Sequence, residues 1–262
     1  MLKTFYLKKI IMKPMYILKE VAFDKIKTEH LPIIEDVKKS LLNYEDKIYS
    51  IYIYGSVATG KSKSPTSDVD FLIVLKRKPS KELEYQLKKV EENLTIKYKK
   101  LFREIGFAIT NKNEVLRGKE IYAWKFFIST ICLLIYGKNI ILDNLQFTPT
   151  KKLAKSLYND LDKDIKTSKE KILNPETKEV EIPIKHIMKV ILRVSFCIIM
   201  EEANAWTTDL KEMADIFLRY YPDKSFEITN ILKLIENPTD KDKAIQILNT
   251  YGKWVSDKFY AL

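Results

Sequence analysis

Residues 51–75 of the chain read Ile51-Tyr-Ile-Tyr-Gly55-Ser56-Val-Ala-Thr-Gly60-Lys61-Ser-Lys-Ser-Pro65-Thr-Ser67-Asp68-Val-Asp70-Phe-Leu-Ile-Val-Leu75. The two ends of this stretch, 51–54 and 71–75, are short apolar runs rich in β-branched and aromatic residues, which favours strands over helices. The segment between them consists largely of glycine, serine, threonine, lysine and proline, a composition typical of a tight polar connection. The stretch therefore predicts two strands joined by a polar loop.

Asp68 and Asp70 stand two residues apart where the second strand begins. Side chains alternate along a strand, so both carboxylates are expected on the same face and close together. Like charges at that spacing repel each other, and a shared divalent cation relieves the repulsion. Gly55 and Ser56 end the first strand with a small residue and a hydroxyl, which lets the backbone approach a phosphate. The pattern predicts a site for a nucleoside triphosphate and Mg²⁺.

The Gly-Ser pair, the polar loop and the Ser-Asp-Val-Asp-Phe sequence before an apolar strand resemble the signature of the DNA polymerase β-like nucleotidyltransferase superfamily. That superfamily includes antibiotic adenylyltransferases, minimal nucleotidyltransferases of toxin–antitoxin systems and RNA-tailing enzymes. The resemblance implies that Asp68 and Asp70 are catalytic and bind two Mg²⁺ ions. It also implies that Gly55 and Ser56 hold the triphosphate. In the mechanism that we expect, Ser67 helps to fix the β- and γ-phosphates, and Lys61 or Lys63 adds positive charge. The competing interpretation is a hairpin in which the two aspartates only cap a turn.

Residues 105–110 predict a third strand, and here the sequence departs from the pattern it resembles. Active members of the superfamily usually carry a third carboxylate in this strand. Its interior in this chain holds no acid, and only Glu104 and Glu114 flank it. Either Glu104 completes the metal site, or another carboxylate does, or the third role is missing and catalysis is weak.

Composition bounds the class of protein. The chain has 262 residues, enough for one large or two modest domains, and its hydrophobic content of 46% is ordinary for a globular protein. Its formal charge of +11 favours a nucleic-acid partner only slightly, because acids number 35 and the lysines are scattered. The longest apolar stretch, 126–136, is too short to span a bilayer, and the start of the chain shows no secretory signal pattern. Cys132 and Cys197 lie in apolar surroundings, so we expect reduced thiols in a cytoplasmic protein without a membrane partner.

The remaining pattern predicts an α+β protein. A nucleotidyltransferase domain over 1–148 would hold a small mixed β-sheet flanked by helices, and an all-α helical bundle would follow over 149–262. Helices are predicted over 32–42 and, after an N-cap at Ser80, up to residue 101; residues 115–136 also look helical, with a C-cap at Gly137. In the second domain, helices are predicted over 151–172, 184–204, 208–221, 225–236 and 240–259. Residues 1–30 could not be assigned.

Residues 187–221 loosely resemble the substrate-side helical domain of streptomycin-type aminoglycoside adenylyltransferases. Within it, Glu201 and Glu202 could bind a cationic substrate, although paired glutamates on a helix are usually solvated. The expected activity is Mg²⁺-dependent transfer of a nucleoside monophosphate, with AMP first, from a nucleoside triphosphate to a hydroxyl on a small molecule such as an aminoglycoside. The alternatives are transfer to tRNA, another RNA or a partner protein, and a nucleotide-binding regulatory module with weak catalysis. A homodimer is left open.

Overall fold

The computed structural model describes residues 15–142 and 144–262, which divide into two compact units. One unit is Leu18–Phe147, and the other is Thr148–Leu262 together with the described residues up to Ile17. Within the unassigned stretch 1–30, residues 1–14 lie outside the described residues. Each unit has its own set of secondary-structure elements and is described separately.

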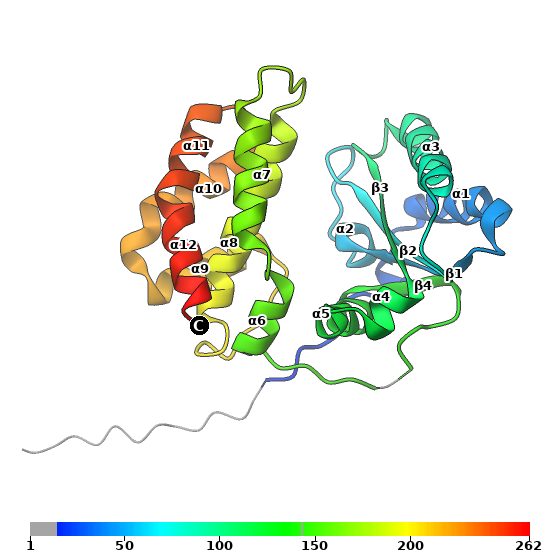
Figure 1. Ribbon diagram of the computed structural model, residues 1–262, viewed down its shortest axis with the longest axis horizontal. Helices are drawn as coiled ribbons and strands as arrows, with labels where there is room; N and C mark the ends of the chain where they lie inside the picture. Colours follow the sequence, from blue (N-terminus) through cyan, green and yellow to red (C-terminus); the bar gives the residue numbers. More distant parts are fainter. Residues whose placement is uncertain (1–14, 143) are drawn as a thin grey trace, which may run out of the picture. The chain divides into compact units, whose positions relative to one another are not determined.

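The first unit is built on a four-stranded mixed sheet within the described residues, with the order β3-β2-β1-β4 (Figure 1). Its strands are β1 Ile48–Tyr54, β2 Val69–Leu75, β3 Ile105–Asn111 and β4 Leu133–Gly137. β1 runs antiparallel to both β2 and β4, whereas β2 and β3 are parallel. The strand–loop–strand prediction for residues 51–75 is thereby confirmed, and so is the mixed sheet.

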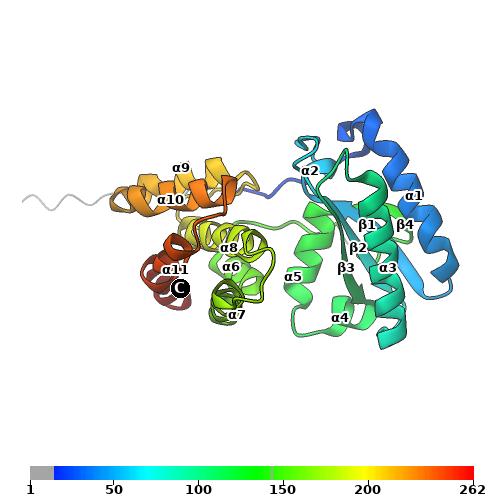
Figure 2. The same ribbon diagram turned by 90° about the horizontal axis from the view of Figure 1, so that it is seen from above.

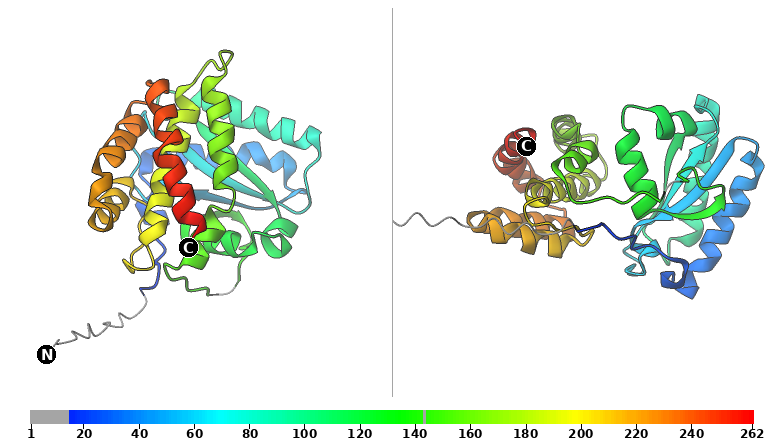
Figure 3. Two further views of the ribbon diagram at one scale, coloured as in Figure 1. Left: turned by 60° about the vertical axis from the view of Figure 1, so that its left-hand side comes forward. Right: turned by 90° about the horizontal axis from the view of Figure 1, so that it is seen from below.

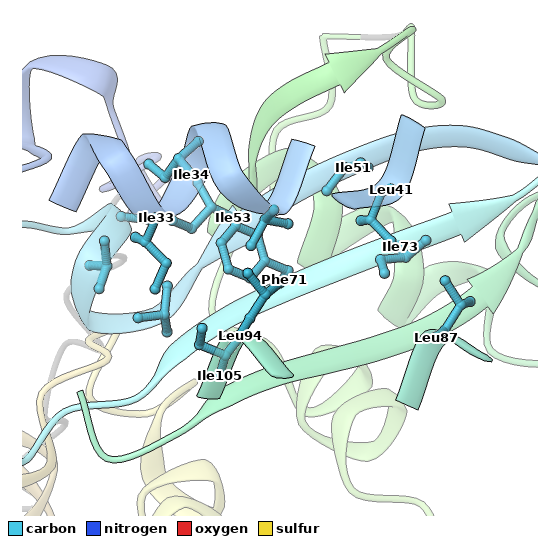
Figure 4. Close-up of a cluster of buried hydrophobic side chains, with 14 of the residues drawn as sticks. Ile33, Ile34, Leu41, Ile51, Ile53, Phe71, Ile73, Leu87, Leu94 and Ile105 are labelled. Carbon is cyan, nitrogen blue, oxygen red and sulfur yellow. The ribbon is translucent and has the colours of Figure 1, made fainter. Parts of the chain in front are cut away.

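Helices cover both faces of this sheet (Figure 2). One face carries α1 Leu31–Leu41 and α3 Lys81–Tyr98, and its core includes Phe71 and Ile73 of β2 (Figure 4). The other face carries α4 Lys112–Arg117, α5 Ile121–Phe126 and the π-helical turn η4 Phe127–Ile131, and it buries Leu72 and Val74. Because side chains alternate along β2, Asp70 shares the face of Leu72.

Two of the three helices predicted in this unit are confirmed, with their start signals in place. α1 has a proline in its first turn, where the missing N–H costs no hydrogen bond. The Ser80 hydroxyl accepts a hydrogen bond from the Leu83 N–H at 3.2 Å, which caps α3.

The helix predicted over 115–136 is interrupted at residues 118–120 and is wrong at its end. The helical segment ends with η4, and residues 133–137 form β4, which pairs with β1. The periodicity of an apolar run of this length is the same in a buried helix and in a buried strand. Hydrogen bonding to β1 stabilises the strand here. Gly137 is therefore a strand end and not a helix cap; its φ is +82°, and a Cβ there would lie 2.2 Å from the Tyr49 carbonyl oxygen.

The second unit is a helical bundle centred on α8 Glu181–Ile199 (Figure 1 and Figure 3). Its other α-helices are α6 Lys151–Leu157, α7 Leu161–Leu173, α9 Leu210–Tyr220, α10 Ser225–Glu236, α11 Lys241–Asn249 and α12 Tyr251–Tyr260. α8 packs against α7, α9, α10 and α12, which explains why its sequence is apolar on nearly every side. Across residues 15–142 and 144–262, no helix combines the length and apolar character needed to cross a membrane.

Two of the helices predicted in this unit are each split in two. The predicted helix 151–172 breaks between α6 and α7 at Asn159 and Asp160, residues whose side chains compete with helical backbone hydrogen bonds. The predicted helix 240–259 breaks at Thr250, next to Gly252, and both residue types have low helix propensity. The prediction of an all-helical second half is confirmed.

Candidate functional site

The two aspartates lie at the start of β2, held there by backbone pairing. Asp70 is the second residue of β2 and pairs with Tyr54 on one side and Gly106 on the other. The ladder continues beyond the strand: the Val69 N–H donates to the Glu104 carbonyl oxygen at 2.9 Å, and the Arg103 N–H donates to the Ser67 carbonyl oxygen at 3.1 Å. The residues on both sides of Asp68 are therefore hydrogen-bonded to residues 103 and 104, and alternation continued from β2 predicts the Asp68 side chain on the face of Asp70.

The Asp70 carboxylate lies between two glycines. A Cβ on Gly55 would come within 2.5 Å of Asp70 Oδ2, and a Cβ on Gly106 would lie 3.6 Å from Asp70 Oδ1. Gly55 also has φ of +74°, a conformation that L-residues with a Cβ rarely adopt. The backbone turn after β1 can approach the Asp70 carboxylate this closely only because residue 55 has no side chain.

Gly55 opens the short helical turn α2 Gly55–Ala58. The Gly55 carbonyl accepts the Thr59 N–H at 3.2 Å, and the Ser56 carbonyl accepts the Lys61 N–H at 2.9 Å. The first N–H groups of a helical turn have no partner within that turn, so they are available to an anion. The predicted phosphate turn thus stands directly beside the predicted metal ligand Asp70.

The other two predicted nucleotide-binding residues, Ser67 and Lys61, already have partners within the first unit. The Ser67 hydroxyl accepts a hydrogen bond from the Lys63 N–H at 2.8 Å and closes the loop in front of Asp68. The Lys61 ammonium lies 3.7 Å from a carboxylate oxygen of Glu20. Ser67 shapes the loop, and Lys61 is a partly exposed cation at its edge.

Arg103 is a residue of this site that the sequence analysis missed. Its Nε donates to Asp68 Oδ1 at 2.7 Å, and its Nη2 donates to Asp68 Oδ2, so the guanidinium contacts both carboxylate oxygens. Burial opposes the charge on Arg103, but the hydrogen bonds and negative charge of Asp68 outweigh it and raise the pKa of the guanidinium. The signal in the sequence was an arginine, scarce in this lysine-rich chain, directly before Glu104.

The position facing Asp70 on β3 is Gly106, so the strand offers no carboxylate there. Glu104 lies just before β3, next to Asp68 in the continued ladder. Within the part of the chain that the structure describes, no three His, Cys, Asp or Glu side chains gather as a metal site, so Asp68, Asp70 and Glu104 do not form a preassembled trio. Mg²⁺ is often bound by one or two carboxylates completed by substrate phosphates and water, and the pair of aspartates fits that donor set.

The loop after α2 rests on residues 22–30, a segment that could not be assigned from sequence. The Lys27 ammonium donates to the Ser62 carbonyl oxygen at 2.9 Å, and a Cβ on Gly60 would lie 2.7 Å from the Lys25 carbonyl oxygen. Buried His30 has Nδ1 3.5 Å from Ser62 Oγ, and its ring packs on Phe102 with centroids 4.8 Å apart. His30 therefore braces both the loop and the residue before Arg103.

We expect the stability of the fold to decrease as the pH falls from about 7.5 to 5.5. Burial lowers the pKa of His30 below its usual 6.5, with Glu29 opposing and Lys27 adding to the shift. Burial likewise lowers the pKa of His186, against the attraction of Asp164. Below about 6.5 the unfolded chain binds these protons more readily than the folded chain, so protonation favours unfolding.

Calorimetric melting at a series of pH values measures this effect. The His30→Gln variant should show a shallower decline of Tm between pH 7.5 and 5.5 than the unaltered protein, and the double variant with His186→Gln a shallower one still. An equally steep decline in the double variant would assign the pH dependence to other groups.

The comparisons with known proteins agree with this geometry. Residues 35–127 match the family model described as Polymerase beta, Nucleotidyltransferase, and that range contains β1, β2, β3 and both aspartates. No curated protein sequence matches the chain.

Among solved structures, the chain is similar in fold to a spectinomycin adenyltransferase, AAD(9), from Enterococcus faecialis, determined with ATP and spectinomycin. The TM-score is 0.53 at 14% sequence identity, and the match covers 88% of this chain and 99% of the other. The likeness extends through the helical unit, in agreement with the order of a mixed-sheet domain followed by helices. Residues 35–127 match a nucleotidyltransferase domain, which confirms the resemblance of the sequence motif to the DNA polymerase β-like nucleotidyltransferase superfamily.

Proposed function

We propose that this nucleotidyltransferase moves AMP from ATP to a hydroxyl group of a small-molecule acceptor, with Mg²⁺ held by Asp68 and Asp70. The observation that carries the proposal is the Asp70 carboxylate lying against the Gly55 backbone, within 2.5 Å of an ideal Cβ position. That contact joins a hard oxygen ligand to a turn suited to phosphate, which is the combination a metal–triphosphate complex requires.

In the proposed reaction the acceptor oxygen attacks the α-phosphorus, the bond to the pyrophosphate oxygen breaks, and the hydroxyl proton passes to a base. Gly55 and Ser56 hold the β- and γ-phosphates through their N–H groups, and Lys61 or Lys63 adds positive charge near the loop. Asp68 and Asp70 supply carboxylate oxygens for two ions. When bound, magnesium stabilises negative charge on the attacking and leaving oxygens.

Glu104 is the carboxylate that we assign as base, because the ladder between Val69 and Glu104 sets it beside Asp68. Replacing Glu104 with glutamine is expected to lower kcat about 10²-fold, the scale of a lost general base, with little change in KM for ATP. Glu114→Gln is the matched control, since Glu114 lies in α4 beyond the other end of β3. Equal rates in the two variants would remove Glu104 from the reaction.

A small molecule is the proposed acceptor because the solved relative was determined with ATP and spectinomycin, and the likeness spans the helical unit. We assign acceptor binding to that unit, residues 149–262. Within it, Glu201 caps α6, since its Oε2 accepts the Lys151 N–H at 2.6 Å, whereas Glu202 is exposed. Glu202 is therefore the better placed of the two to meet a cation.

The second candidate acceptor is RNA, and the formal charge of +11 is the observation that favours it. The test offers α-labelled ATP, GTP, CTP and UTP separately with Mg²⁺, together with spectinomycin, streptomycin, tRNA or no acceptor. Label on a drug from ATP supports the proposal, and label on tRNA supports the second candidate. Nucleotide binding without any labelled product would leave a regulatory module and contradict both.

A further inference from the structure

The Asp68 carboxylate is already paired with a positively charged side chain of this protein. The Arg103 guanidinium contacts both of its carboxylate oxygens, through Nε at 2.7 Å and through Nη2. A guanidinium fork on a carboxylate is among the strongest side-chain pairings because two parallel charge-assisted hydrogen bonds form at once. Any other cation that binds Asp68 must therefore compete with the Arg103 guanidinium.

The backbone of Arg103 is fixed, whereas its side chain has room to move. The Arg103 N–H is bound to the Ser67 carbonyl oxygen at 3.1 Å, and the preceding Phe102 is buried against His30. The Arg103 side chain is 42% exposed and that of Asp68 is 26% exposed. The guanidinium can therefore rotate away from Asp68 without disturbing the sheet.

A divalent cation bound to Asp68 takes oxygen lone pairs that the guanidinium now uses, and the two positive charges would repel each other at that distance. Asp70 is placed differently, because its carboxylate lies between Gly55 and Gly106. The two aspartates therefore differ in what metal binding requires of them. Asp70 already lies beside the Gly55 turn, whereas Asp68 must exchange its partner.

We propose that Arg103 and Asp68 form an exchangeable pair. Asp68 passes from the guanidinium to the divalent cation of a metal–triphosphate complex, and the released Arg103 binds a phosphate of the same nucleotide. This inference rests on the proposed function and adds a positioning residue to it.

The exchange leaves no charge unpaired. Before it, the Asp68 carboxylate neutralises Arg103; after it, the carboxylate faces the metal and the guanidinium faces a phosphate, whose tetrahedral oxygens suit the same planar fork. A metal alone would take Asp68 from Arg103 without supplying a phosphate in its place, and a nucleotide alone would meet an Arg103 that is still bound to Asp68. Metal and nucleotide should therefore each strengthen the binding of the other.

The test measures Mn²⁺ affinity by electron paramagnetic resonance, with and without a non-hydrolysable ATP analogue, in the full chain. For Arg103→Ala we expect Mn²⁺ alone to bind about tenfold more tightly, and the analogue in the presence of Mn²⁺ to bind about tenfold more weakly, within the usual range of coupling between sites. Arg103→Lys keeps the charge but loses the fork, so its values should fall between those of the protein and of Arg103→Ala. Arg77→Ala, an exposed arginine after β2, is the matched control.

Unchanged affinities in Arg103→Ala and Arg103→Lys, with native circular dichroism, would show the pair to be only structural and would overturn the proposal. If Arg103→Ala does not fold, the lysine variant alone decides by the same readings. Binding of the Mn²⁺–analogue complex to the unaltered protein separates the two levels of inference. If the complex binds but the Arg103 variants match the control, the exchange proposal is rejected and the proposed function is retained. If the complex does not bind, both are rejected.

Discussion

Replacing Asp70 with asparagine is expected to reduce nucleotidyl transfer about 10³-fold while the fold is retained. The side chain keeps its shape between Gly55 and Gly106, so the contacts with both glycines persist. What disappears is the negative charge that holds the metal in the proposed function, and metal stabilisation of the reacting oxygens contributes several kcal/mol, at about 1.4 kcal/mol for each factor of ten. The rate of label transfer from α-labelled ATP measures the change.

Asp46→Asn is the control for this experiment, because Asp46 is an exposed aspartate of the same unit, in the turn before β1. Circular dichroism and Tm should match between the two variants. A second variant with both Asp68→Asn and Asp70→Asn should be no more active than Asp70→Asn alone. Transfer at an undiminished rate by the double variant would show that these carboxylates do not hold a catalytic metal.

Replacing Gly55 with alanine should reduce the rate about 10²-fold without removing any charged group. The new Cβ would lie 2.5 Å from Asp70 Oδ2, so the carboxylate must move from its position. A displacement of about 1 Å in a catalytic constellation can cost that factor in rate. The backbone φ of +74° adds strain of roughly 1–2 kcal/mol for a residue with a Cβ, which should lower Tm as well.

Two other glycines separate displacement of Asp70 from backbone strain. Gly60→Ala has the same φ of +74° and a close contact with the Lys25 carbonyl, so it should lose stability with a much smaller loss of rate. Gly106→Ala places a Cβ 3.6 Å from Asp70 Oδ1, an ordinary contact, and should keep both rate and Tm close to those of the unaltered protein. If Gly60→Ala were as inactive as Gly55→Ala, strain alone would account for both.

The parts of this fold that depend on neighbouring residues in the chain could be predicted from sequence. Alternation and composition predicted β1 and β2, and the Ser80 cap predicted where α3 begins. β4 was missed because an apolar run shows the same pattern in a buried helix and in a strand, and only its pairing with a distant strand separates the two.

The same reason explains what was missed in the candidate site. The ion pair of Arg103 with Asp68 joins residues 35 positions apart, and the link of His30 to Ser62 joins residues 32 positions apart. Neither pair has a local signature. The parallel pairing of β2 with β3 brings Arg103 to the acids, and it also sets Gly106, not Glu104, opposite Asp70. Register across a sheet is fixed by all its strands together, so motif spacing alone did not contain it.

Replacing Gly106 with an acidic residue requires only one base change. Every glycine codon becomes an aspartate or glutamate codon through one base change at its second position. The ideal Cβ at this position meets Asp70 Oδ1 at an ordinary 3.6 Å, so the backbone there accepts a residue with a Cβ. Selection for faster turnover would therefore find a third acidic ligand one mutation away, on a strand that is already built to present it.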